Sequence, residues 1–183
     1  MPNPKLAMIG GFPGSGKSVL SKRVSRRLHI PRISFDDLRA MFYNKRYPDY
    51  IAKDCGLQKR YATSDEEESV VQQTAKNLSL YYLSGGLSVL VDSTFSNNPM
   101  RGWFADTKEI ESGKHLFVAQ VNPEVLKERL SKRGNQYRPE TVDIWMKRWE
   151  EPTNHGYKTI ILPNNTGSEY KKNVRKVIGI LSE

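Results

Sequence analysis

The chain has 183 residues, of which 37% are hydrophobic, and this size fits one domain with a single core. Lysine and arginine number 29 against 20 acidic residues, and the formal net charge of +9 favours anionic partners. The single cysteine, Cys55, excludes an intramolecular disulfide and a cysteine-based zinc cluster. Because the sequence has no long apolar run and no signal segment, we expect a cytoplasmic protein without a membrane partner.

A phosphate-binding loop is the first motif along the chain. Residues 11–18 read GFPGSGKS, a complete Walker A signature between an apolar run at 6–9 and a helix-like stretch. Glycines let the backbone amides face a phosphate, and the following helix adds its positive N-terminal end. We expect Lys17 to reach the β- and γ-phosphates of ATP or a similar nucleoside triphosphate, and Ser18 to bind Mg²⁺. The expected nucleotide-binding residues of the loop are Gly11, Pro13, Gly14, Ser15, Gly16, Lys17, Ser18 and Val19.

Short apolar runs alternate with amphipathic segments along the whole chain. The strand-like runs lie at 6–9, 30–35, 87–91, 116–121 and 159–162. This alternation predicts a three-layer α/β/α fold, in which helices cover both faces of a parallel sheet and ligands bind at the carboxyl ends of the strands. We expect one domain over residues 1–183.

An acidic run at 65–68 is expected to begin a helix. Ser64 and Glu67 form a capping-box pattern, and Gly85 and Gly86 end the helical spacing. Carboxylates are favourable at a helix N-terminus, which explains the run without a metal site.

The segment from about 43 to 64 mixes cations with aromatic residues and is expected to be an excursion on the substrate side. Its members include Lys45, Arg46, Tyr47, Tyr50, Lys53, Lys59, Arg60 and Tyr61. Such a mixture suits phosphates and stacked bases. It equally suits a surface segment whose tyrosines pack on the domain.

Two carboxylates, Asp36 and Asp37, follow the second strand-like run and open a helix. In a doubly wound sheet they lie on the same rim as the phosphate loop, where one is a candidate base for an acceptor hydroxyl and one a helix cap. Arg39 lies near Asp36 on the same helical face. It is placed either to hold an acceptor phosphate or to pair with the carboxylate.

Asp92 ends the apolar run 87–91, as a Walker B carboxylate does. We expect it to hold Mg²⁺ through water. Ser93 and Thr94 follow in a polar loop that either contacts substrate or caps the helix starting near Pro99.

Arg129 and Arg133 are four residues apart at the end of a basic helix, and a polar loop at about 133–139 follows. This pattern is typical of a small lid, and we expect Arg129 and Arg133 to bind the nucleotide, with Arg133 neutralising charge in the transition state. The alternative is a solvated basic helix end that is favourable to the helix dipole.

Together these residues resemble the P-loop kinase family that includes the 5′-hydroxyl kinase domain of phage polynucleotide kinase, among small kinases of the zeta-toxin and AAA type. The resemblance implies that Asp36 accepts the proton of the attacking hydroxyl and that Arg39 orients the acceptor phosphate. It also implies that Asp92 with Ser93 is the strand-end motif, that Arg133 contacts the nucleotide phosphates, and that the sheet order is 2-3-1-4-5. The chain departs from that family after residue 160, where a strand and a helix replace a phosphatase domain.

The leading hypothesis is an ATP-dependent kinase that transfers the γ-phosphoryl group to a hydroxyl with Mg²⁺, the acceptor being the 5′ end of RNA or DNA. A kinase for a sugar, an antibiotic or another small molecule is the alternative, because related kinases share this framework. A third class is an ATP-operated switch. Such a switch needs neither the acceptor base nor the acceptor clamp that Asp36 and Arg39 suggest.

Overall fold

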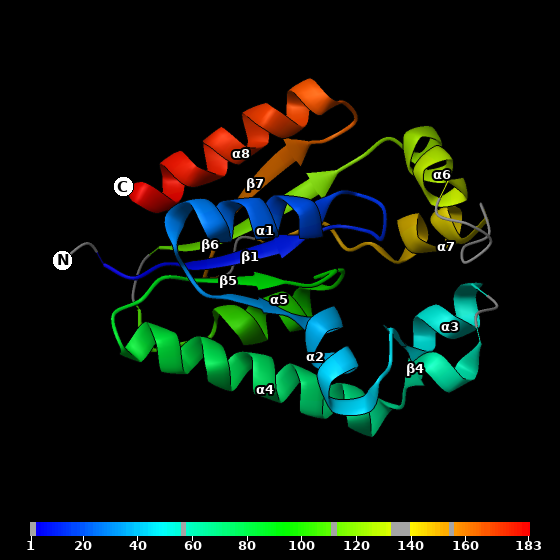
Figure 1. The fold of residues 1–183 in the computed structure, drawn as a ribbon, viewed down its shortest axis with the longest axis horizontal. Helices are drawn as coiled ribbons and strands as arrows, with labels where there is room; N and C mark the ends of the chain where they lie inside the picture. The colour runs from blue at the N-terminus through cyan, green and yellow to red at the C-terminus, as the bar shows by residue number, and fades with distance from the viewer. Residues whose placement is uncertain (1–2, 56–57, 111–112, 133–139, 154–155) are drawn as a thin grey trace.

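The computed structural model describes residues 3–55, 58–110, 113–132, 140–153 and 156–183. A five-stranded parallel sheet forms the centre, with the order β2-β5-β1-β6-β7 (Figure 1). Its strands are β1 (Leu6–Gly10), β2 (Arg32–Ser34), β5 (Val89–Asp92), β6 (Lys114–Gln120) and β7 (Lys158–Pro163).

In chain order these are the second, third, first, fourth and fifth strands of this sheet. The labels differ from the expected 2-3-1-4-5 because two further strands, β3 (Tyr47–Pro48) and β4 (Ala62–Thr63), pair with each other in a separate small sheet.

Helices cover both faces of the main sheet, which confirms the three-layer α/β/α class (Figure 1). On one face lie α1 (Lys17–Leu28) and α8 (Gly167–Ser182). On the other face lie α2 (Phe35–Tyr43), α4 (Asp65–Ser84) and α5 (Asn98–Ala105).

Strand β1 is buried along its whole length because it lies between these two layers. Its residues alternate between the two cores: Leu6 and Met8 pack with α2, α4 and α5, whereas Ala7 and Ile9 pack with α1 and α8. Within the described ranges, no helix has both the length and the apolar character needed to cross a membrane.

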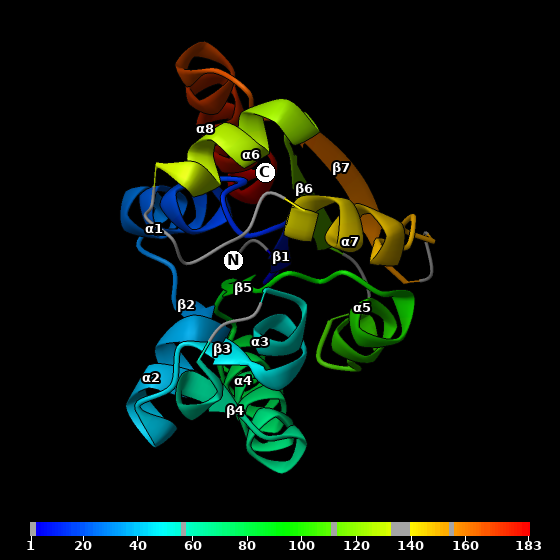
Figure 2. The ribbon, with the colours of Figure 1, turned by 90° about the vertical axis from the view of Figure 1, so that its right-hand side faces the viewer.

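A third group of elements lies at the carboxyl ends of the strands (Figure 2). It contains α3 (Asp49–Cys55), η1 (Lys59–Tyr61), α6 (Pro123–Ser131) and α7 (Glu140–Arg148). Ile51 of α3, Leu126 of α6 and Trp145 of α7 belong to one apolar cluster, to which Phe12 of the phosphate loop adds its ring. The expected lid at 133–139 lies outside the described residues.

Candidate functional site

The phosphate loop joins β1 to α1 and depends on glycine at the positions where the chain turns. Gly11 has φ 138°, and a Cβ there would lie 2.7 Å from the carbonyl oxygen of Ala119. Gly16 has φ 88° and directly precedes α1; a Cβ there would lie 2.6 Å from Nδ2 of Asn164. Only glycine fits both the backbone angles and this space. The N-cap residue of α1 is Gly16, which has no side chain to cap the helix, so the first amides of α1 are available to an anion.

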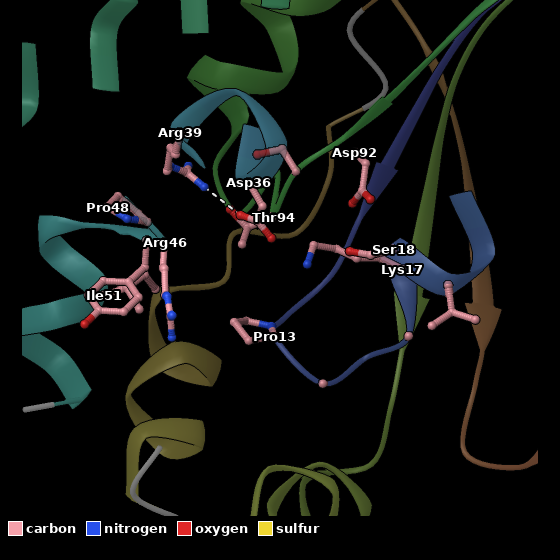
Figure 3. Close-up of a pocket in the computed structure, with 15 residues that line it drawn as sticks. Pro13, Lys17, Ser18, Asp36, Arg39, Arg46, Pro48, Ile51, Asp92 and Thr94 are labelled. Atoms are coloured by element: carbon pink, nitrogen blue, oxygen red, sulfur yellow. Dashed lines mark hydrogen bonds and ion pairs between the residues drawn. The ribbon is translucent and has the colours of Figure 1, made fainter. Parts of the chain in front are cut away.

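A cleft of about 750 Å³, part of it open to solvent, lies in front of the loop, and we call it the loop cleft (Figure 3). The lining residues are Pro13, Gly14, Gly16, Lys17, Ser18, Val19, Asp36, Arg39, Arg46, Tyr47, Pro48, Ile51, Asp92, Ser93 and Thr94. The structure therefore brings most of the expected site residues to one cavity. Of the expected loop residues, Gly11 and Ser15 do not line it.

Asp92 lies at the cleft but is held in a buried network with Arg32. Its Oδ2 accepts hydrogen bonds from Oγ of Ser21 and from Nη2 of Arg32, both at 2.7 Å. Arg32 also donates to Asp37 at 2.6 Å. Burial lowers the pKa of the Arg32 guanidinium, but the bonds to the two carboxylates outweigh it, so that pKa is raised above its ordinary value. These bonds hold the Asp92 side chain in place at the strand end.

This arrangement fits the expected Mg²⁺ role through water. Ser18 lines the same cleft as Asp92, and among the described residues its hydroxyl makes no hydrogen bond. Oδ1 of Asp92 likewise has no hydrogen bond within the described ranges, whereas Oδ2 is engaged. A hydroxyl and a carboxylate oxygen are the hard ligands that Mg²⁺ takes.

Asp36 and Arg39 form an ion pair at the start of α2, one of the two arrangements expected from the sequence (Figure 3). Nη1 of Arg39 donates to Oδ1 of Asp36 at 2.7 Å, and the Asp36 side chain is 61% exposed. Arg39 is also bound by Glu68 of α4 through two bonds, Nε to Oε2 at 2.8 Å and Nη2 to Oε1 at 2.6 Å. Two carboxylates therefore balance the charge of Arg39, and Asp36 keeps an open side facing the cleft.

Arg129 differs from the expectation that it contacts the nucleotide. Its guanidinium donates to the backbone carbonyls of Asn164 and Asn165 at 2.8 Å and of Gly14 at 3.4 Å, and it does not line the loop cleft. Arg129 therefore links the phosphate loop to the segment that follows β7. Arg133 lies outside the described residues.

Two further residues at the site were not among those selected from the sequence. Arg46 lines the loop cleft opposite Pro13, and its guanidinium carbon lies 5.2 Å from the ring centroid of Tyr61 (Figure 3). Asn164 is buried and donates from Nδ2 to the carbonyl of Ser15 at 2.6 Å. The basic and aromatic composition of 43–64 was the only signal for Arg46, and the position of Asn164 just after the last strand-like run, 159–162, was the only signal for Asn164.

The phosphate loop is also tied to α7 through aromatic rings. The ring of Phe12 lies 6.1 Å from that of Trp145 in a stacked arrangement, and 5.2 Å from that of Trp149 in an edge arrangement. Such pairs stabilise a contact beyond the area they bury. Trp145 of α7 and Trp149, directly after that helix, therefore hold the Phe12 ring of the phosphate loop in place.

With this geometry in place, comparison with known proteins identifies the family. The model of a family described as "AAA domain" matches residues 6–152. The chain belongs to this family.

Two curated relatives are similar to this chain over only part of their own length. One protein of Methanocaldococcus jannaschii, provisionally named an adenylate kinase, is 28% identical over 134 residues, which cover 73% of this chain and 60% of the relative. An uncharacterized protein of Mycobacterium tuberculosis is 26% identical over 144 residues, 76% of this chain and 28% of the relative. The chain thus spans less than two thirds of these relatives.

Solved structures share the whole fold at low identity. A sugar kinase from Janibacter superposes with a TM-score of 0.73 at 16% identity, covering 98% of this chain and 95% of that one. A gluconokinase from Sinorhizobium meliloti gives a TM-score of 0.68 at 17% identity, covering 100% and 94%. An APS kinase from Mycobacterium tuberculosis gives 0.64 at 15%, with both chains covered fully. The three-layer α/β/α fold of this chain is therefore shared with these three solved structures.

Proposed function

We propose that the protein is an ATP-dependent kinase that transfers the γ-phosphoryl group to a hydroxyl acceptor. The observation that carries this proposal is that Lys17 of the phosphate loop and the exposed carboxylate of Asp36 line one cleft (Figure 3). A nucleotide switch needs the first group but has no use for the second.

In this proposal Lys17 and the amides at the start of α1 bind the β- and γ-phosphates of ATP. Asp36 accepts the proton of the attacking hydroxyl, and its bond to Arg39 keeps the carboxylate oriented. Mg²⁺, when bound by Ser18 and through water by Asp92, would neutralise charge on the transferring group. Arg46 lies across the cleft from the phosphate loop, and its positive charge also stabilises the negative charge on the transferring phosphoryl group.

The leading acceptor from the sequence is the 5′-hydroxyl of a polynucleotide, RNA or DNA. Its support is the net charge of +9 and the basic, aromatic segment beside the cleft, where Arg46 and Arg60 both lie over the ring of Tyr61. A small-molecule acceptor is the second candidate. The observation that favours it is the engagement of Arg39, the expected phosphate clamp, by Glu68 and Asp36.

The Asp36→Asn variant tests the kinase assignment. We expect ATP affinity to stay near that of the wild type and phosphoryl transfer to fall by about a hundredfold or more, the effect of removing a general base. Asp65→Asn is the matched control, because Asp65 is an exposed carboxylate at the start of α4 that does not line the cleft. Equal loss of ATP affinity and transfer in Asp36→Asn would assign Asp36 to binding alone and contradict its role as base.

A further inference from the structure

A second cleft adjoins the loop cleft and shares Arg39, Ser93 and Thr94 with it; we call it the adjoining cleft. It encloses about 760 Å³ including its open mouth, and is lined by Arg39, Glu68, Gln72, Ser93, Thr94, Ser96, Asn97, Met100, Arg148 and Glu150. The enclosed part, about 310 Å³, lies at the lower end of the range of roughly 300–1,000 Å³ typical of small-molecule sites. Asp36 is bonded to Arg39 at the boundary, so the proposed base is beside both clefts.

The adjoining cleft offers neutral hydrogen-bonding groups that can both donate and accept. Gln72 contributes a carboxamide, and Ser93, Thr94 and Ser96 contribute hydroxyls. Among the described residues these four side chains make no hydrogen bond, so they are available to a ligand. Hydroxyls and amides of this kind match the hydroxyl groups of a sugar or polyol, which also donate and accept.

The charges that line the adjoining cleft balance one another and so do not attract an anionic acceptor. Of the described lining residues, Arg39 and Arg148 carry positive charge, and Glu68 and Glu150 carry negative charge. Glu68 accepts from Nε and Nη2 of the Arg39 guanidinium and Asp36 accepts from Nη1, so two carboxylates compensate the charge of Arg39. The lining of the adjoining cleft therefore has no net positive charge to hold an acceptor phosphate, although the chain as a whole carries +9.

We propose that the acceptor is an uncharged polyhydroxyl molecule of monosaccharide size, bound in the adjoining cleft with one hydroxyl beside Asp36. This inference rests on the proposed kinase function and specifies its substrate class. It makes Gln72 a specificity-determining residue, because its carboxamide lines the adjoining cleft from α4.

The test measures phosphoryl transfer from ATP to three matched sets of acceptors: neutral hexoses and polyols, sugar acids with the same carbon skeletons, and 5′-hydroxyl oligonucleotides. We expect the best neutral compound to exceed its sugar acid and every oligonucleotide by at least about tenfold in kcat/KM. Titration calorimetry of the same compounds into the complex with a non-hydrolysable ATP analogue measures acceptor binding independently of turnover.

A variant pair locates the binding in the cleft. We expect Gln72→Leu to raise the KM for the neutral acceptor by roughly 3- to 10-fold while the KM for ATP is unchanged. Gln73→Leu is the matched control, because Gln73 is exposed on the same helix, bonds Asn77 and does not line the cleft. Equal KM values in both variants would overturn the assignment of the cleft.

The remaining outcomes distinguish a failure of the inference from a failure of the proposed kinase function. Preferred transfer to a sugar acid or an oligonucleotide would overturn the inference and leave the kinase function standing. Binding of a neutral compound without transfer to any acceptor would support the cleft and overturn the kinase function. Absence of both binding and transfer for every neutral compound overturns the inference.

Discussion

The ion pair between Arg39 and Glu68 sets the charge on the acceptor side, and the Glu68→Gln variant measures its strength. The side chains are 6% and 12% exposed and share two hydrogen bonds. Removing one partner of a buried pair costs about 3–5 kcal/mol, because it leaves the other charge uncompensated. Asp36 still contacts Arg39 in this variant, but its side chain is 61% exposed, so solvent screens that pair. The pair with Asp36 therefore offsets little of the stability lost with Glu68. We therefore expect a loss of about 3 kcal/mol in the free energy of unfolding.

For a chain of this size each kcal/mol shifts the melting temperature by about 2–4 °C, so a decrease of about 6–12 °C is expected in calorimetry, with a matching loss in urea unfolding. Glu66→Gln is the control, because Glu66 lies on the same first turn but is exposed; we expect a change within about 0.5 kcal/mol. Replacing Arg39 and Glu68 together by methionine should recover much of the loss. A loss under about 1 kcal/mol in Glu68→Gln would refute the reasoning that this pair fixes Arg39.

Two predictions concern the loop and the sheet. Gly16→Ala places a Cβ against Nδ2 of Asn164 at φ 88°, so we expect it to lower the free energy of unfolding by about 1–3 kcal/mol and to weaken ATP binding. Gly179→Ala, in open space inside α8, should raise the free energy of unfolding by up to about 1 kcal/mol. Urea unfolding of both variants checks the two signs, and equal effects would contradict the strain at Gly16. Burial lowers the pKa of His115 below its ordinary value of about 6.5, so the unfolded chain binds a proton that the folded chain does not, and the free energy of unfolding should fall as the pH drops from about 7 to 5.5. His115→Gln should flatten that fall, and an identical pH slope in the variant would show that His115 does not cause it.

Local patterns in the sequence predicted the features that depend on neighbouring residues. The capping box at the start of α4 is confirmed, since Ser64 accepts from the amide of Glu67 and Glu67 accepts from the amide of Ser64. The strand-like runs and the phosphate loop likewise gave the α/β/α class, because periodicity and glycine spacing are properties of short segments.

Charge partners that meet only in the folded chain were not predictable. The acidic run 65–68 was interpreted as a helix start, and its last residue, Glu68, also binds Arg39 from 29 positions away. Arg32 was not selected at all, although it reaches Asp92 across the boundary between β2 and β5, 60 positions apart. The position of Arg129 beside the phosphate loop depends on the path of the chain after β7. The spacing of residues along α6 carries no information about that path.

The most direct test of the central claim follows the label of [γ-³²P]ATP into hydroxyl acceptors, with the wild type and Lys17→Ala compared at equal concentration. Lys17 lines the loop cleft and belongs to the phosphate loop, so its loss should leave the fold intact by circular dichroism and abolish transfer. The account predicts labelled acceptor with the wild type and none with the variant. Transfer by folded Lys17→Ala at the wild-type rate, or wild-type protein that hydrolyses ATP and labels no acceptor, would contradict it.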